Sequence, residues 1–135
     1  MSDRVSIEID GIGHGDTPIP MACRVANVIF SSGIPGRNPA DGRRPDDPEQ
    51  EVEFAFGNVA AVIRRAGADV DDVAEMTVLV SDESIRPLVD PYWVRMFPDS
   101  ASRPARHTTV QQLRGGARIQ LRFVAVVGRG NEPGS

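Results

Sequence analysis

Two segments near the end of the chain decide the fold: PARHTT at residues 104–109 and IQLRFVAVV at residues 119–127. Both read as β-strands, and each carries a polar side chain that needs a partner when buried, Arg106 in the first and Gln120 in the second. A planar guanidinium can bind a carboxylate through two parallel hydrogen bonds. The pattern therefore indicates a site for a small carboxylate, with a surface or ion-pair arginine as the alternative reading of Arg106.

The second segment presents two different faces. One face is apolar throughout and can pack on helices: Ile119, Leu121, Phe123, Ala125 and Val127. The opposite face is apolar in part: Arg118, Gln120, Arg122, Val124 and Val126. We therefore expect another copy of the chain to cover this second face, with Gln120 in a cleft between copies.

Apolar and alternating runs upstream predict three further strands, at residues 4–9, 26–33 and 73–80. A helix over Pro48–Ala66 begins after Asp47 and stops at Gly67. The loop before this helix is rich in proline, glycine and charged residues, so it can rim a cleft.

A shorter helix follows the strand at residues 73–80. Asp82 or Ser84 would cap it, and Pro91 would lie in or near its first turn, where the missing N–H costs little. Residues 106–113 and 117–127 would then pair as a closing hairpin. The resulting order, ββαβαββ, predicts an α+β fold with two helices packed on one face of a sheet.

Composition limits the remaining possibilities. A chain of 135 residues fits one domain, residues 1–135, with mobile tails expected at about residues 1–3 and 129–135. The net charge of −4 disfavours nucleic acid as a partner. All 15 basic residues are arginine, which excludes a Schiff-base lysine and a phosphate-loop lysine.

The cysteine and histidine usage points to an intracellular protein without a metal. The one cysteine, Cys23, allows no internal disulfide, and the histidines show no metal-ligand spacing. We expect no metal and no organic cofactor. Because neither a signal peptide nor a long apolar run is present, we also expect no membrane association and a cytoplasmic location.

Taken in order, several short strings resemble the reactive-intermediate deaminase superfamily, also called the Rid or YjgF-like family. They run from about Ile19 to Val127 and comprise residues 27–33, 66–67, 72–73, 77–80, 104–106 and 124–126. The resemblance implies a chorismate-mutase-like α+β fold and a homotrimer with three ligand sites in the clefts between subunits. In its best-known branch, the enzymes hydrolyse reactive imines or enamines to 2-oxo acids and ammonia.

The resemblance also implies which residues form the site. The family's carboxylate-binding arginine matches Arg106, and the segment that lines the same cleft matches the backbone of Ser32, Gly33 and Ile34. These residues are therefore expected to bind the small carboxylate.

Four positions depart from the family's pattern. Gln120 stands where the deaminases have a glutamate that positions the attacking water, and an amide can orient water but cannot accept its proton at neutral pH. Ile19 replaces a pocket tyrosine, Thr108 a pocket cysteine, and Asp90 an asparagine of the second helix. Asp90 is either a substitute base for Gln120 or an ordinary carboxylate near a helix start.

Three functions remain open. The first is hydrolytic deamination of an imine or enamine of a small carboxylated metabolite, with catalysis by Arg106, Gln120 and Asp90. The second is a non-catalytic trimer that binds a small carboxylate. The third, an endoribonuclease or translation inhibitor, is disfavoured by the acidic balance and by the lack of an aromatic stacking platform. Three residues keep open roles: His107, His14 and Cys23.

Overall fold

The computed structural model describes residues 3–128, so of the expected tails at residues 1–3 and 129–135 only Asp3 lies within it. The strands are β1 (Val5–Ile7), β2 (Ala22–Val25), β3 (Val28–Ser31), β4 (Ile34–Pro35), β5 (Val73–Val80), β6 (Ala105–Val110) and β7 (Ile119–Val126). The helices are α1 (Pro48–Arg65) and α2 (Arg86–Met96), and short 3-10 turns lie at Val70–Asp72 and Arg114–Gly116.

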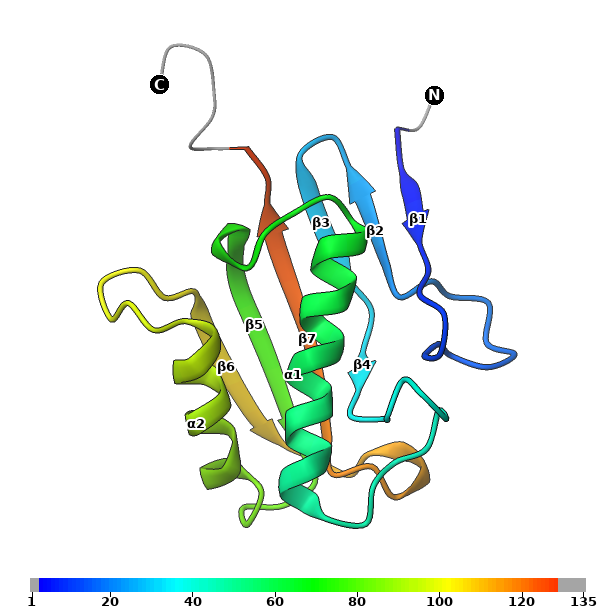
Figure 1. The fold of residues 1–135 in the computed structure, drawn as a ribbon, viewed down its shortest axis with the longest axis vertical. Coiled ribbons are helices and arrows are strands. Elements are labelled where there is room, and N and C mark those ends of the chain that lie inside the picture. Colours follow the sequence, from blue (N-terminus) through cyan, green and yellow to red (C-terminus); the bar gives the residue numbers. More distant parts are fainter. Residues whose placement is uncertain (1–2, 129–135) are drawn as a thin grey trace.

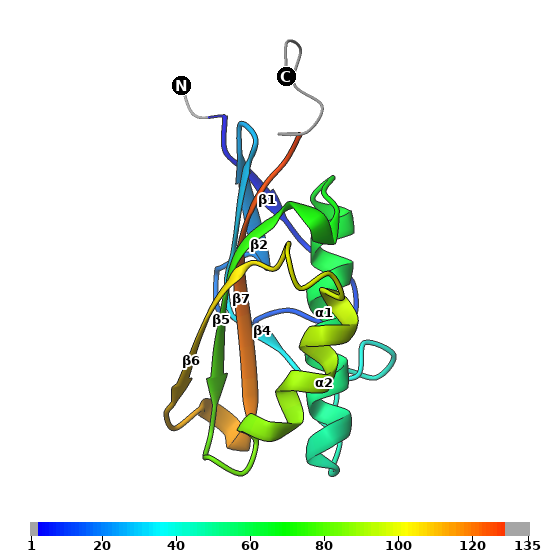
Figure 2. The same ribbon diagram turned by 90° about the vertical axis from the view of Figure 1, so that its left-hand side faces the viewer.

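All of these strands belong to one sheet, in the order β1-β2-β3-β7-β5-β6 (Figure 1). β3 and β4 pair one after the other along the same side of β7. Figure 2 views the sheet nearly edge-on and shows α1 and α2 on the same face. The predicted α+β fold, a sheet with two helices on one face, is confirmed.

The helix α1 begins and ends where the sequence predicts. Asp47 caps its start by accepting a hydrogen bond from the Glu49 amide at 3.3 Å, and Pro48 occupies the first turn. Gly67 follows the last turn with φ of +83°, a backbone conformation that favours glycine. The apolar side of α1 is buried against the sheet, with Val52, Phe56, Val59 and Ile63 in the core.

β7 lies at the centre of the sheet, between β3 and β5. Its predicted apolar face is buried under the helices, because Ile119, Leu121, Phe123 and Ala125 are all at most 2% exposed. Alternation along the strand then turns Gln120 toward the face that carries no helix. This central position fixes Gln120 more firmly than an edge strand would.

β6 and β7 do not form the predicted closing hairpin. β5 lies between them, parallel to β6 and antiparallel to β7. Parallel neighbours need a crossover, which α2 supplies between β5 and β6. Alternation predicts that a segment is a strand but not which strand pairs with it. As a consequence β6, which carries Arg106, is the edge of the sheet.

The predicted strand at residues 26–33 is also wrong at its start. Val25 pairs with Val28, so Ala26 and Asn27 form a tight turn between β2 and β3. Ala26 has φ of +54°, which alanine seldom adopts, so Asn27 alone, a residue that favours turns, was too weak a signal to predict the hairpin. Arg24 stabilises the turn, because its Nε donates to the Ala26 carbonyl at 3.0 Å.

The start of α2 differs from the prediction in two respects. Ile85 is its N-cap residue and makes no side-chain cap, while Asp82 accepts hydrogen bonds from the amide and hydroxyl of Ser84 in the turn before the helix. Pro91 lies inside the helix rather than in its first turn. Asp90, its neighbour, is therefore also an interior residue of α2.

Candidate functional site

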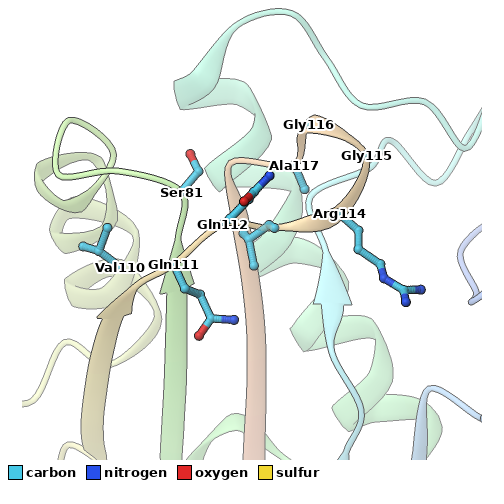
Figure 3. A pocket seen from close by; sticks show the side chains of 9 residues that line it. Ser81, Val110, Gln111, Gln112, Arg114, Gly115, Gly116 and Ala117 are labelled. Atoms are coloured by element: carbon cyan, nitrogen blue, oxygen red, sulfur yellow. The ribbon is translucent and has the colours of Figure 1, made fainter.

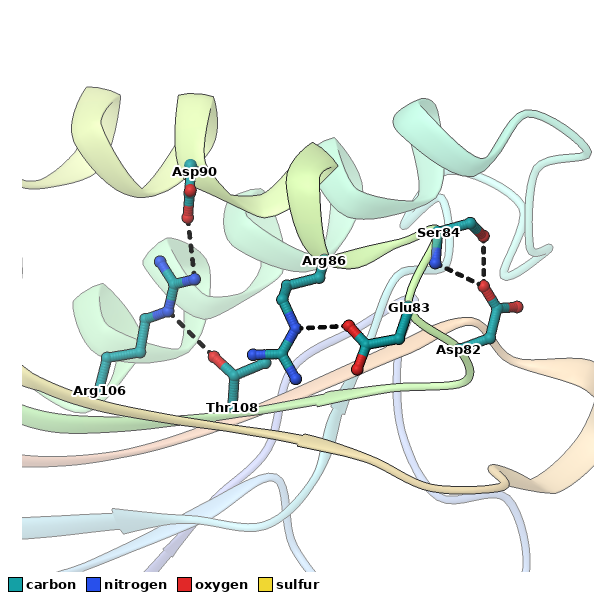
Figure 4. A network of polar contacts seen from close by, with 7 residues as sticks. All are labelled: Asp82, Glu83, Ser84, Arg86, Asp90, Arg106 and Thr108. Atoms are coloured by element: carbon teal, nitrogen blue, oxygen red, sulfur yellow. Dashed lines mark hydrogen bonds and ion pairs between the residues drawn. The ribbon is translucent and has the colours of Figure 1, made fainter.

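Arg106 forms the centre of a group of side chains between β6 and α2, which we call the arginine cluster: Arg106, Thr108, Asp90 and Trp93. Its Nη2 lies 2.8 Å from Oδ1 of Asp90, and its Nε donates to the Thr108 hydroxyl at 3.1 Å (Figure 4). The guanidinium carbon also lies 5.2 Å from the centre of the Trp93 ring. These contacts hold the guanidinium in one place.

The arginine cluster retains the capacity to bind an anion. Two of the five N–H donors of Arg106 are engaged, by Thr108 and Asp90, which leaves three for a ligand. The Arg106 side chain is 20% exposed, so a small carboxylate can reach it. Asp90 is 67% exposed and is already paired with Arg106. Arg106 therefore forms an ion pair, as the alternative interpretation held, and can still bind a ligand.

Two further polar contacts near α2 lie apart from the arginine cluster. The hydroxyl and amide of Ser84 donate to Asp82, and these hydrogen bonds hold the pKa of the Asp82 carboxyl below its usual value (Figure 4). Burial and the neighbouring Glu49 raise the pKa of Tyr92, whose hydroxyl lies 3.2 Å from the Glu49 carboxylate. Neither group touches Arg106.

Gln120 lines a cavity of about 640 Å³ on another part of the molecule, which we call the Gln120 pocket. Gly33 and Ile19 line the same cavity. A Cβ atom added at Gly33 would lie 2.4 Å from Nε2 of Gln120, so a larger residue here would displace this amide from its present position. The structure thus brings together three of the predicted site residues: Gln120, Gly33 and Ile19.

The neighbours of Gly33 are placed differently. Ser32 is half-buried, and its amide donates to the Met21 carbonyl at 2.9 Å. Ile34 is fully buried in the core and pairs with Leu121 through β4. Neither lines the Gln120 pocket, so Gly33 is the member of this segment that a ligand there would contact.

His14 joins the Gln120 pocket, although in the sequence it stands in a glycine-rich segment typical of a loop. Its Nε2 lies 2.9 Å from the Gly33 carbonyl, and because a carbonyl only accepts, Nε2 carries the hydrogen. Nδ1 is buried and has no hydrogen-bond partner among residues 3–128. His107, in contrast, lies next to Arg106 on β6 and is exposed.

The arginine cluster and the Gln120 pocket lie on opposite faces of the sheet. Arg106 pairs with Met76 of β5, and Gln120 with Leu79, three residues further along the same strand. Successive residues of a strand point to opposite faces, so an odd separation places these two side chains on different sides. One chain by itself does not bring Arg106 and Gln120 to the same ligand.

Arg118 departs from its predicted place on the open face of β7. It precedes the strand, and its Nη1 lies 2.7 Å from Oε1 of Glu51, which is fully buried near the start of α1. Its amide also donates to Oε2 of Glu51 at 2.9 Å. Glu51 was missed because an acidic residue in a first helical turn is normally exposed to solvent.

Residues 3–128 contain no candidate metal-binding group and no helix that could cross a membrane. Within residues 3–128, no three side chains of His, Cys, Asp or Glu come close enough together to hold a metal ion. Neither of the two helices in that range has the length and apolar character needed to cross a membrane.

The sequence and the fold of this chain are similar to those of known proteins. The family model described as endoribonuclease L-PSP matches residues 19–127. The chain is 30% identical over 113 residues to the 2-iminobutanoate/2-iminopropanoate deaminase of Mus musculus, covering 82% of each protein. It is 28% identical over 110 residues to a RutC family protein of Aquifex aeolicus (strain VF5), covering 81% of this chain and 88% of the relative. The fold matches the YjgF gene product of E. coli with a TM-score of 0.81 and 26% identity, covering 90% of this chain and 98% of that one.

Proposed function

The chain belongs to the endoribonuclease L-PSP family, also known as the Rid or YjgF-like family, and from this membership we propose that it hydrolyses reactive imines or enamines of small 2-oxo acids. Its relative in Mus musculus is named as a deaminase of two such imines, 2-iminobutanoate and 2-iminopropanoate. The proposed products are the 2-oxo acid and ammonia, and the proposed location is the cytoplasm.

One observation carries the proposal: the amide of Gln120 is held against Gly33 inside a cavity large enough for a small acid. Gln120 occupies the position at which the family resemblance implies a water-positioning glutamate. The cavity supplies polar groups for a ligand, but its Gln120 amide cannot accept a proton at neutral pH. Positioning alone can still speed hydrolysis substantially when the substrate is intrinsically reactive.

Arg106 and Gln120 have separate roles in the proposed reaction. Arg106 binds the substrate carboxylate, using the N–H donors that Thr108 and Asp90 leave available. Gln120 orients a water molecule toward the imine carbon, and that water forms the new C–O bond. The nitrogen takes up the protons released by the water and leaves as ammonia when the C–N bond breaks.

Because Arg106 and Gln120 lie on opposite faces of one chain, this chemistry needs two copies. We propose a homotrimer in which the arginine cluster of one subunit faces the Gln120 pocket of the next. The half-buried apolar residues on the open face of β7, Val124 and Val126, support burial of this face against a second copy.

The proposal is tested by generating an imine with an amino-acid oxidase and trapping it with semicarbazide. We expect the wild-type protein to lower the amount trapped, because hydrolysis competes with the trap. Arg106→Ala should abolish this effect, while Arg103→Ala, at an exposed arginine just before β6, should retain it. Equal trapping with and without wild-type protein, for every imine tried, would contradict the proposal.

A second candidate is a trimer that binds a small carboxylate without turning it over. The observation in its favour is the same amide, because a pocket with Gln120 lacks the glutamate of the deaminases. It predicts saturable binding of 2-oxo acids, with a thermal stabilisation that grows with ligand concentration by mass action. Saturable binding together with unchanged imine trapping would support this candidate over the first.

A further inference from the structure

The Gln120 pocket is strongly cationic within an acidic protein. Three arginines line it, Arg37, Arg44 and Arg114. Among the described residues of its wall, Glu51 is the only carboxylate, and it is already paired with Arg118. The whole chain has a net charge of −4, so this concentration of positive charge is local. Such a cavity attracts an anionic ligand.

The guanidinium groups of the pocket are available to a ligand. Arg44 and Arg114 are exposed, and their guanidinium groups make no hydrogen bond or ion pair with other residues in the range 3–128. Arg37 uses Nη2 to donate to the Gly13 carbonyl at 2.6 Å, which orients its side chain and leaves further donors open. A ligand in the pocket therefore meets unpaired N–H donors.

Arg44 and Arg114 meet at the same turn. The turn Arg114–Gly116 leads into β7, and Figure 3 shows the Arg114 side chain extending from it, away from Ser81 and Val110. A Cβ atom added at Gly116 would lie 3.1 Å from Nη2 of Arg44, so the Arg44 guanidinium packs against this turn. Two segments far apart in sequence thus bring their arginines to one side of the pocket.

The two buried polar side chains of the described core both hold these segments in place. Asn58 is 2% exposed, and its Nδ2 donates to the carbonyls of Pro35, at 2.9 Å, and Arg37, at 2.8 Å. Burying an amide is costly unless it is fully hydrogen-bonded, and here its bonds hold the backbone on which Arg37 stands.

Through Arg118, the buried Glu51 holds the two segments that carry Arg44 and Arg114. The Arg118 guanidinium donates to the carbonyls of Pro45, at 3.3 Å, and Asp46, at 2.9 Å, just after Arg44 in the chain. The Arg118 amide, shortly after the Arg114 turn, donates to Glu51. A buried carboxylate thereby fastens both segments to α1. The backbone that carries Arg37, Arg44 and Arg114, which together we call the cationic wall, is held in place.

We propose that this cationic wall binds a second carboxylate of the substrate, so that the natural substrate is the imine of a 2-oxo dicarboxylic acid. The inference rests on the proposed function, and it assigns the substrate class of the same site. One carboxylate is bound by Arg106, and the other by Arg44 and Arg114, with Arg37 beside them. Such an imine arises when an oxidase with its own electron acceptor oxidises an acidic amino acid at the α-carbon.

The test compares two imines that differ in one carboxylate. D-Glutamate with a D-aspartate oxidase yields 2-iminopentanedioate, and D-norvaline with a D-amino-acid oxidase yields 2-iminopentanoate. We expect wild-type kcat/KM to be higher for the dicarboxylate. In Arg44→Gln/Arg114→Gln the ratio of the two kcat/KM values should fall at least about tenfold, because the loss of a single hydrogen bond to a charged group already has about this effect.

Arg43→Gln is the matched control, because it removes the same charge from the same loop at an exposed residue that does not line the pocket. It should leave the ratio unchanged. A wild-type ratio of one or less, or an equal fall in the control and the double variant, would overturn the inference.

A binding measurement separates this inference from the proposed function. If wild type hydrolyses neither imine, calorimetry with 2-oxopentanedioate and 2-oxopentanoate still measures the preference for a second carboxylate. Tighter binding of the dicarboxylate that is lost in Arg44→Gln/Arg114→Gln would support the inference while the proposed function fails. Equal affinity for both acids, or no binding of either, would overturn the inference.

Discussion

At the level of single residues, Asp90 would compete with the carboxylate of the proposed substrate for Arg106. Its Oδ1 lies 2.8 Å from Nη2 of Arg106, so a carboxylate must share the guanidinium with a charge of the same sign. Because Asp90 is 67% exposed, solvent screens this repulsion and its effect is small.

Replacing Asp90 with asparagine should therefore improve substrate binding. We expect Asp90→Asn to lower KM about two- to fivefold with little change in kcat, as the loss of an exposed charge interaction allows. Steady-state kinetics with a monocarboxylic imine provide the measurement. A fall in kcat of more than about tenfold would show instead that Asp90 acts as the base that Gln120 is not.

In the proposed reaction, Gln120 positions the attacking water at the other half of the site. In Gln120→Glu the side chain keeps its size but gains a proton acceptor, and the nearby arginines favour its charged form. We expect kcat to rise at least about tenfold, since a positioned general base commonly contributes more than this. Gln120→Leu, which cannot orient water, should be inactive. A kcat for Gln120→Glu at or below the wild-type value would contradict this role.

At the scale of the element, the first turns of α1 hold the rim of the Gln120 pocket through Glu51. Its carboxylate is 1% exposed and meets both the amide and the guanidinium of Arg118. An isolated buried charge is costly, so removing one partner of this pair leaves the other poorly solvated.

We expect Glu51→Gln to lower the free energy of unfolding by about 1–3 kcal/mol, less than for a fully buried pair because Arg118 is part exposed. Glu53→Gln, on the exposed side of the same helix, should change it by less than about 0.5 kcal/mol. Urea denaturation of both variants measures the difference. Equal stability of the two would show that the Glu51–Arg118 pair does not stabilise the fold.

The helices and strands could be predicted from the sequence only in part. Local signals predicted α1 with its cap at Asp47, the strand Val73–Val80, and the apolar face of β7, because capping chemistry and alternation are local properties. The pairing of β5 between β6 and β7 depends on the path of α2, which no local pattern encodes. The turn at Ala26 was missed because alanine seldom adopts the positive φ that it has there.

The candidate site could also be predicted only in part. The types of Arg106 and Gln120 pointed to a carboxylate site from the sequence. Their separation onto opposite faces required the register of β5 with both neighbours. His14 and Glu51 could not be assigned, because each owes its place to a partner many residues away, Gly33 and Arg118.

In the proposed homotrimer, each active site takes Arg106 from one subunit and Gln120 from its neighbour. Arg106→Ala and Gln120→Leu should each be inactive alone. When the two variants are unfolded together and refolded as mixed oligomers, some interfaces combine an intact Arg106 with an intact Gln120 from different chains.

The imine-hydrolysis rate of the mixed oligomers shows whether the site is shared between subunits. Random mixing of equal amounts in a trimer should restore about a quarter of the wild-type rate, the fraction of interfaces that receive both intact residues. Each variant refolded alone should stay at the background rate. A mixture that also stays at background, although size-exclusion chromatography and native mass spectrometry show mixed trimers, would contradict the shared site.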